Sequence, residues 1–194
     1  MNKIDITKLV NFDTNLWADI KVIVGLGNPL PQYAETRHNA GAIVVSILAD
    51  KLNLHFKRRN NYEIASGRIE TADGEREVAL VIPLTFMNNS GELFLPLMHF
   101  LHITPENILV IHDDLEKKVS TFGFKFAGSD RGHNGLRSII SAIGENFYRL
   151  RIGIGRPLPE VPVSNYVLEP FSDEELFCLE VFSNQFFNFL KGED

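Results

Sequence analysis

Short uninterrupted apolar runs recur along this chain, each bounded by polar or turn-forming residues. The runs at residues 20–24 and 108–111 are rich in β-branched side chains and lack polar alternation, which is typical of strands covered on both faces. A weaker pattern at residues 122–126 alternates and predicts an edge strand. In total we expect strands at residues 20–24, 62–69, 78–82, 108–111, 122–126 and 148–154, with a turn around Asp73-Gly74.

Apolar residues spaced three or four positions apart separate these runs and predict helices over residues 40–54, 93–101 and 135–143. A closing helix is expected to begin at Ser172, whose hydroxyl suits a helix cap. Since strands and helices alternate, we predict an α/β fold: one domain with a twisted mixed, mostly parallel sheet flanked by helices. This domain covers residues 20–194. Residues 1–19 form an N-terminal extension without an assigned role.

The composition narrows the class of protein. With 194 residues, 44% apolar and 23% charged, the chain has enough apolar sequence for one substantial core. A net charge of −6 argues against a general nucleic-acid binder, although it allows a local basic patch. A single cysteine, Cys178, fits a reducing compartment, and the N-terminus has no stretch long enough for a signal peptide or a membrane span. We therefore expect a cytoplasmic protein.

The segment that follows the first predicted strand invites a cofactor interpretation. Gly25-Leu26-Gly27-Asn28-Pro29-Leu30 is one residue short of the glycine fingerprint of dinucleotide-binding folds. Pro29 and Pro31 each remove a backbone N–H that would bind pyrophosphate, so we disfavour a nucleotide-dependent oxidoreductase. A tight turn that needs glycine dihedrals explains both glycines and leaves Asn28 available for chemistry.

A histidine and two carboxylates form the next group of candidates. His38 becomes a general base only if a carboxylate holds its second ring nitrogen, because the base needs a fixed tautomer. Asp113 and Asp114 follow the apolar run at residues 108–111 and are candidates. For Asp114 we expect a solvated turn. For Asp113 the spacing alone leaves a turn and a functional role equally open.

Two further loops carry amides between a predicted strand and a predicted helix. Asn88 lies in residues 83–91, and Asn134 follows His133 in residues 132–135. Each asparagine either caps the helix that follows or grips a peptide group, since an amide both donates and accepts hydrogen bonds.

Other chemistries are less well supported. His38, His112, His133, Asp113 and Asp114 include zinc-ligand types, but no H-x-x-x-H, H-E-x-x-H or C-x-x-C spacing accompanies them. No G-x-S-x-G elbow indicates a serine nucleophile.

Basic residues gather in the second half of the chain, and they are either a solvated face or a phosphate site. These basic residues are Lys125, Arg131, Arg137, Arg149, Arg151 and Arg156.

Taken together, the segments resemble the bacterial-type peptidyl-tRNA hydrolase family in order and spacing over roughly residues 20–190. The shared blocks are Val24-Gly25-Leu26-Gly27-Asn28-Pro29, Tyr33, Thr36-Arg37-His38-Asn39-Ala40-Gly41, Pro83-Leu84-Thr85-Phe86-Met87-Asn88-Asn89-Ser90-Gly91, His112-Asp113-Asp114-Leu115, Gly132-His133-Asn134-Gly135-Leu136 and Arg149-Leu150-Arg151-Ile152-Gly153-Ile154-Gly155-Arg156-Pro157.

The resemblance implies an esterase that cleaves the bond between a peptide and the 3′ end of tRNA, recycling the tRNA by His-assisted attack of water. It implies that His38 is the base and Asp113 its orienting partner. It implies substrate-binding roles for Asn28, Tyr33, Asn88 and Asn134, and tRNA-binding roles for Lys125, His133 and Arg151. A monomer without metal or cofactor is expected, with peptidyl-tRNA as the partner. A non-catalytic RNA-binding module on the same fold is the main rival.

The chain departs from the family pattern at three places. Leu30 stands where glycine is common, which predicts a stiffer loop beside Asn28. Gly123 replaces a residue that is often basic, two positions before Lys125, which predicts a weaker phosphate clamp. Asp130-Arg131 occupies a loop that is usually rich in small residues, where it either adds a phosphate contact or restricts access.

Overall fold

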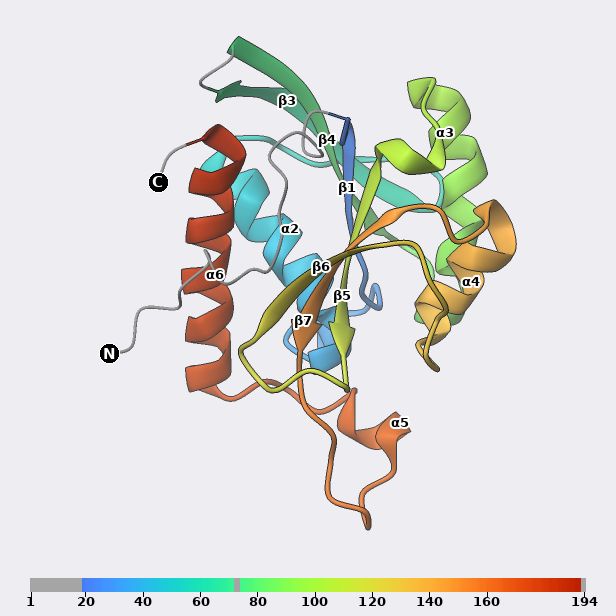
Figure 1. Cartoon of the computed structure of the whole chain (residues 1–194), viewed down its shortest axis with the longest axis vertical. Coiled ribbons are helices and arrows are strands. Elements are labelled where there is room, and N and C mark those ends of the chain that lie inside the picture. Colours follow the sequence, from blue (N-terminus) through green and yellow to red (C-terminus); the bar gives the residue numbers. More distant parts are fainter. Residues whose placement is uncertain (1–18, 72–73, 193–194) are drawn as a thin grey trace.

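The computed structural model describes residues 19–71 and 74–192. Seven strands form one sheet in the order β2-β3-β4-β1-β5-β7-β6 (Figure 1). The strands are β1 (Val22–Gly25), β2 (Lys57–Arg58), β3 (Tyr62–Thr71), β4 (Gly74–Pro83), β5 (Ile108–Asp114), β6 (Phe122–Phe126) and β7 (Tyr148–Gly153). The sheet contains every strand predicted from the sequence, together with the two-residue strand β2.

The sheet is mixed, as predicted. Its centre is parallel, because β1 pairs in parallel with β4 and β5, and β5 pairs in parallel with β7. Both sides are antiparallel: β2, β3 and β4 on one side, and β6 against β7 on the other. The prediction of β6 as an edge strand is confirmed. Of the turn predicted at Asp73-Gly74, Asp73 lies outside the described residues, as do residues 1–18 of the predicted extension.

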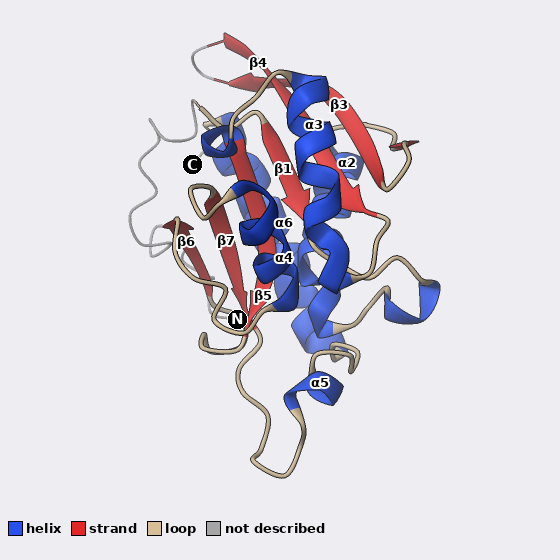
Figure 2. Ribbon diagram, turned by 90° about the vertical axis from the view of Figure 1, so that its right-hand side faces the viewer, coloured by secondary structure: helices blue, strands red, loops and turns tan. Residues whose placement is uncertain are grey.

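Helices cover both faces of the sheet (Figure 2). The helices α2 (Ala40–Lys51) and α6 (Asp173–Lys191) pack on one face around a core that includes Leu48 and Phe182. The helices α3 (Phe94–Leu101) and α4 (Asn134–Ile143) pack on the other face. The short helix α5 (Val163–Tyr166) lies beyond the carboxyl ends of the strands. The described residues also form four short 3-10 helices: η2 (Pro31–Tyr33), η3 (Arg37–Asn39), η4 (Met87–Leu93) and η5 (Pro105–Asn107).

The closing helix begins as its sequence predicts. Ser172 caps α6 by accepting a hydrogen bond from the backbone N–H of Glu175, and the Glu175 side chain accepts one from the backbone N–H of Ser172. This reciprocal capping box satisfies two backbone donors at the start of the helix. No helix among the described residues is both long and apolar enough to cross a bilayer.

Gly25 and Gly27 serve a purpose different from the one predicted. Neither has a positive φ, so the proposed need for glycine dihedrals is wrong. Instead, the start of α2 approaches the strand ends so closely that side chains do not fit between them. A Cβ added to Gly25 would lie 2.6 Å from the carbonyl carbon of Gly41, and one added to Gly41 would lie 2.6 Å from the backbone nitrogen of Leu26. The glycines therefore bring the segment that carries His38 onto β1 and β5.

Leu30 fits this loop without strain. Its φ of −92° and ψ of 147° are extended values that any residue adopts, and its side chain is exposed. The backbone at this position therefore does not require the glycine that is common in the family.

Candidate active site

The predicted site residues come from loops and strand ends that meet at one edge of the sheet, the lower edge in Figure 1. Asn28 follows β1, Met87 and Asn88 follow β4, and Asp113 is the penultimate residue of β5. The strand β5 continues through Asp114, three residues further than predicted, because His112, Asp113 and Asp114 pair with Arg151, Ile152 and Gly153 of β7. The carboxyl ends of parallel strands are the usual place for a ligand site in such a sheet.

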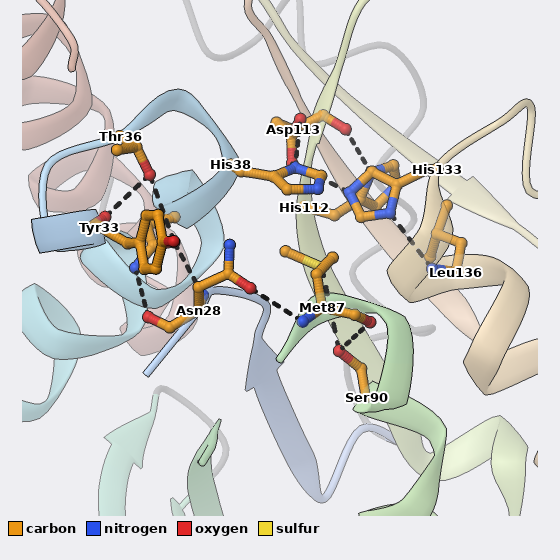
Figure 3. A network of polar contacts seen from close by, with 11 residues as sticks. Asn28, Tyr33, Thr36, His38, Met87, Ser90, His112, Asp113, His133 and Leu136 are labelled. Atoms are coloured by element: carbon orange, nitrogen blue, oxygen red, sulfur yellow. Dashed lines mark hydrogen bonds and ion pairs between the residues drawn. The ribbon is translucent and has the colours of Figure 1, made fainter. Parts of the chain in front are cut away.

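His38 and Asp113 form the centre of this site (Figure 3). His38 lies in η3, directly before α2, and its Nδ1 is 2.9 Å and 3.1 Å from the two carboxylate oxygens of Asp113. The Asp113 carboxylate is buried, with 2% of its side chain exposed. Nε2 of His38 makes no hydrogen bond to another described residue, and the ring lines a cavity of about 180 Å³. One ring nitrogen is thus held by a carboxylate while the other faces the cavity.

Electrostatics couple the two groups. Burial opposes protonation of the His38 ring, but the charge of Asp113 and its hydrogen bond outweigh this effect, so the pKa of His38 is raised. Burial also opposes ionisation of Asp113, yet His38 and His133 hold the pKa of this carboxyl well below its usual range. Asp113 therefore stays ionised and stabilises an imidazolium at His38.

His133 is a second partner of Asp113. Its Nε2 is 2.9 Å from Asp113 Oδ1, and its Nδ1 accepts a hydrogen bond from the backbone N–H of Leu136 at 3.2 Å, which caps α4. Because Nδ1 accepts, the proton of the neutral ring sits on Nε2 and is donated to Asp113. Both ring nitrogens are occupied by contacts within the protein, and the tRNA contact expected for this residue stays a prediction. The sequence motif marked His133 as functional but carried no sign of these two bonds.

His112 is the third histidine of the cluster and is buried. Its Nδ1 lies 2.6 Å from the backbone carbonyl oxygen of Asp113, and its ring centroid lies 5.1 Å from that of His133. Burial lowers the pKa of His112 to about 3. The ring is therefore neutral at physiological pH and adds no charge to the site.

The His38, Asp113 and His133 ligand atoms lie within 4.8 Å of one another, close enough for a shared metal ion. The hydrogen bonds of His133 do not fit this use. If Nε2 held a cation, Nδ1 could accept from Leu136 only as an imidazolate. The arrangement is instead that of a carboxylate, Asp113, which accepts hydrogen bonds from the ring N–H groups of His38 and His133.

Asn28 is fixed by contacts on both its backbone and its side chain. Its Oδ1 accepts a hydrogen bond from the backbone N–H of Met87 at 2.9 Å. The Asn39 side chain accepts from the Asn28 N–H at 2.8 Å and donates to the Asn28 carbonyl oxygen at 3.0 Å. In Figure 3 the amide nitrogen of Asn28 points to the side of the network where His38 lies. Since its oxygen is occupied, Asn28 presents a hydrogen-bond donor.

Asn39 belongs to the family motif, but sequence reasoning gave it no role. Replacing Asn39 with alanine leaves the backbone N–H and C=O of Asn28 without these partners. We expect a loss of about 1–3 kcal/mol in the free energy of unfolding, together with a lower kcat. Urea unfolding and steady-state kinetics measure the two effects. Unchanged stability with normal kcat would show that Asn28 needs no such support, and alanine at the exposed Asn89 is the control.

The other predicted substrate-binding residues lie around this core. Tyr33 packs edge-on against Phe86, with ring centroids 6.5 Å apart, on the Asn28 side of the site. Asn88 is exposed next to Met87 in η4. Asn134 is exposed at the start of α4, lines the cavity, and accepts a hydrogen bond from Arg137 at 3.2 Å. Neither Asn88 nor Asn134 caps the helix that follows its loop.

Four cationic side chains line the same cavity as His38: Lys125, Arg131, Arg149 and Arg151. Burial and the charges of the three arginines lower the pKa of Lys125. The buried Arg149 guanidinium donates to the carbonyl oxygens of Ser129, at 2.8 Å, and Gly128. Arg149 thus braces the loop at residues 127–133. Lys125 and Arg151 are the predicted tRNA contacts, and the structure brings both to the cavity.

Asp114 is not in a solvated turn, so that prediction is wrong. The residue is buried, and its carboxylate accepts a hydrogen bond from Arg151 Nε at 2.5 Å and from the backbone N–H of Glu116 at 2.8 Å. Burial opposes ionisation, but these two bonds hold the pKa of Asp114 below its usual range. Asp114 therefore orients Arg151, a role that only the pairing of β5 with β7 reveals.

The backbone of His38 is held by residues from far along the chain. Its N–H donates to the carbonyl oxygen of Val167 at 2.8 Å, and the N–H of Arg37 donates to that of Glu169 at 3.0 Å. The Arg37 guanidinium lies 4.5 Å from the centroid of the Tyr166 ring and pairs with Glu175 at 3.2 Å. The segment after α5 therefore fixes the position of η3.

The chain is similar to known proteins over most of its length. A family model described as peptidyl-tRNA hydrolase matches residues 22–191. A peptidyl-tRNA hydrolase of Acinetobacter baylyi is 45% identical over 161 residues, covering 83% of this chain and 82% of that protein. One from a Mycobacterium species is 42% identical over 161 residues, covering 81% and 82%. A crystal structure of peptidyl-tRNA hydrolase from Acinetobacter baumannii superposes with a TM-score of 0.82 at 40% identity, covering 89% of this chain and 87% of that one.

Proposed function

Because the chain belongs to the peptidyl-tRNA hydrolase family, its reaction is the hydrolysis of peptidyl-tRNA, and we propose that His38 is the general base for it. The observation that carries the proposal is the 2.9 Å contact between His38 Nδ1 and Asp113 Oδ1, with His38 Nε2 left facing the cavity. An ester is reactive enough for water and a well-placed base, so no covalent nucleophile is needed.

In this mechanism, neutral His38 carries its proton on Nδ1, where Asp113 accepts it. Nε2 takes a proton from a water molecule as the water oxygen attacks the ester carbonyl. The imidazolium that forms is stabilised by Asp113. When the tetrahedral intermediate collapses, the bond to the ribose oxygen of tRNA breaks, and His38 returns the proton to that oxygen. The products are a free peptide carboxylate and deacylated tRNA.

The oxyanion of the intermediate needs a donor, and Asn28 is suited to provide it. The Met87 N–H donates to Asn28 Oδ1, so the NH₂ group of the Asn28 side chain points away from Met87. The bonds from Asn39 fix the backbone below the amide, so the donor is preorganised for the developing charge. We assign Asn88 and Tyr33 to the peptide, and Asn134, which lines the cavity, to the attacking water or the peptide.

The tRNA is proposed to place a phosphate group against Lys125 and Arg151. Both line the cavity that also contains His38, so one substrate reaches the base and the cations together. His133 acts through Asp113 in this scheme, because its ring nitrogens are already occupied. We further propose that the protein works as a monomer in the cytoplasm, without a metal or cofactor.

Two substrates test this function. The wild type is expected to hydrolyse N-acetyl-aminoacyl-tRNA and, less efficiently, the matching N-acetyl-aminoacyl ester of adenosine, which has no phosphate. Lys125→Ala is expected to raise KM for the tRNA substrate about tenfold, through the loss of one charge-assisted hydrogen bond. Its kcat/KM for the adenosine ester is expected to be unchanged.

Lys57→Ala is the matched control, because it removes the same charge from β2. This strand is the first in the sheet order, whereas Lys125 lies in β6, the last. An equal penalty of Lys125→Ala on both substrates would remove the phosphate role of Lys125. A wild type that binds tRNA without hydrolysing either ester would instead be the RNA-binding module considered above.

A further inference from the structure

The side chain of Lys117 crosses two glycines on the face of the sheet that carries the cations. Lys117 lies in the loop between β5 and β6. A Cβ added to Gly153 of β7 would lie 2.9 Å from Lys117 Cβ, and one added to Gly123 of β6 would lie 2.9 Å from Lys117 Nζ. Gly155 N–H donates to the Lys117 carbonyl oxygen at 2.9 Å, which anchors the start of the side chain. Because neither glycine has a side chain, the Lys117 side chain lies over both of them, and its ammonium lies next to Gly123.

This position places the ammonium beside Arg151. Gly123 pairs with Arg151 across β6 and β7, and Lys125 pairs with Arg149 in the same ladder. Residues two apart on a strand share a face, so Gly123 and Lys125 line one face of β6, as Arg149 and Arg151 line the same face of β7. The Lys117 ammonium thus occupies the place in this row where β6 itself offers no side chain.

The ammonium forms no ion pair with a carboxylate among the described residues. Within residues 19–71 and 74–192, no carboxylate lies within 4 Å of Lys117 Nζ, and the neighbouring Glu116 is paired with Arg156. Burial and the nearby charge of Arg151 lower the pKa of Lys117, against the opposing charge of Asp114. Asp114 is itself bound to Arg151 Nε. Two cations therefore lie near one carboxylate, to which Arg151 donates a hydrogen bond.

We propose that Lys117 is a third phosphate-binding residue, which binds a tRNA phosphate oxygen together with Arg151. An anion between the two cations relieves their repulsion, and a fixed side-chain stem keeps the ordering cost of binding small. The proposal deepens the function above and rests on it. It also reverses the prediction that Gly123 weakens the clamp: the glycine makes room for an ammonium that comes from another part of the chain.

The first test removes the charge and keeps the stem. Lys117→Met is expected to weaken binding of deacylated tRNA about fivefold, and to make the dependence of log K on log salt less steep by about one. KM for N-acetyl-aminoacyl-tRNA is expected to rise by a similar factor, while kcat/KM for the adenosine ester stays unchanged. Lys118→Met is the matched control, since Lys118 is the exposed neighbour, and it is expected to bind tRNA as the wild type does.

Two further variants test the position of the ammonium. One displaces the ammonium of Lys117, and the other supplies an ammonium from β6 in its place. Gly123→Ala places a methyl group 2.9 Å from Nζ, where the flexible end of the lysine yields, so tRNA binding is expected to weaken in the same direction. Combining Lys117→Met with Gly123→Lys supplies an ammonium directly from β6 and is expected to restore binding. A purely structural role for Lys117 predicts neither the substrate difference nor this rescue.

The outcomes separate the two proposals. A wild type that hydrolyses acyl-tRNA, with Lys117→Met and Lys118→Met indistinguishable in tRNA affinity and salt dependence, overturns the role of Lys117 alone. An equal loss on the adenosine ester overturns it as well. A wild type that hydrolyses neither substrate overturns the proposed function, and the inference with it.

Discussion

Replacing His38 with alanine is expected to lower kcat about 10²–10⁴-fold, the usual contribution of a general base. Neither of the other two histidines at the site is placed to accept the proton of the attacking water. His112 faces the Asp113 backbone, and His133 has both ring nitrogens occupied. Single-turnover hydrolysis of N-acetyl-aminoacyl-tRNA measures the chemical step directly.

The affinity for deacylated tRNA is the control for this variant. Lys125 and Arg151 do not depend on the His38 ring, and Asp113 keeps its hydrogen bond from His133, so binding is expected to stay within about twofold of the wild type. If catalysis and tRNA binding fell by the same factor, His38 would be a structural residue. A variant with near-normal kcat would require another base.

The second large effect is expected from Asp113→Asn, which changes the protonation pattern and leaves the shape almost unaltered. Asp113 accepts from His38 Nδ1 and from His133 Nε2. Both rings contact Oδ1, and His38 Nδ1 also lies 3.1 Å from Oδ2, so an amide turned either way places its NH₂ group beside His38 Nδ1. Where its NH₂ group faces His38, the ring carries its proton on Nε2, the atom that must accept from water. We expect kcat to fall about 10²–10⁴-fold, as for other bases held in the wrong tautomer.

The same variant predicts a shift in the pH profile. In the wild type, Asp113 raises the pKa of His38, and the base is lost as the pH falls below that raised value. The amide has no charge, so burial dominates and the pKa of His38 drops. The acidic limb of kcat/KM is therefore expected to move to lower pH while the plateau falls. An acidic limb that stays in place would mean that His38 does not control it, and circular dichroism checks that the variant is folded.

The sequence predicted the fold well because the fold depends on short-range patterns. Continuous apolar runs indicated the central strands, and the Ser172 cap located the start of α6. What failed were inferences about single residues whose partners are distant. The sequence predicts a turn at Asp114, and only the pairing of β5 with β7 shows that this residue belongs to a strand. The sequence likewise predicts a turn at Gly25, and only the packing of α2 shows why a glycine is needed there.

The candidate site shows the same division. The family motif identified His38 and Asp113, but not the bonds that give each neighbour its role. Asn39 supports Asn28 across eleven residues, and His133 both caps a helix and holds a carboxylate. Lys117 lies outside every motif, because its position depends on glycines in two other strands.

The hydrogen bonds from η3 to Val167 and Glu169 have a consequence for biosynthesis. During its own translation this protein is a peptidyl-tRNA, the substrate class of its family. All the side chains assigned to chemistry and to tRNA binding precede residue 152, yet the backbone that seats the base is completed by residues 166–175. A nascent chain that has emerged only as far as β7 therefore lacks a supported His38. His38 therefore gains its backbone support only after every residue assigned to the chemistry and to tRNA binding has been synthesised.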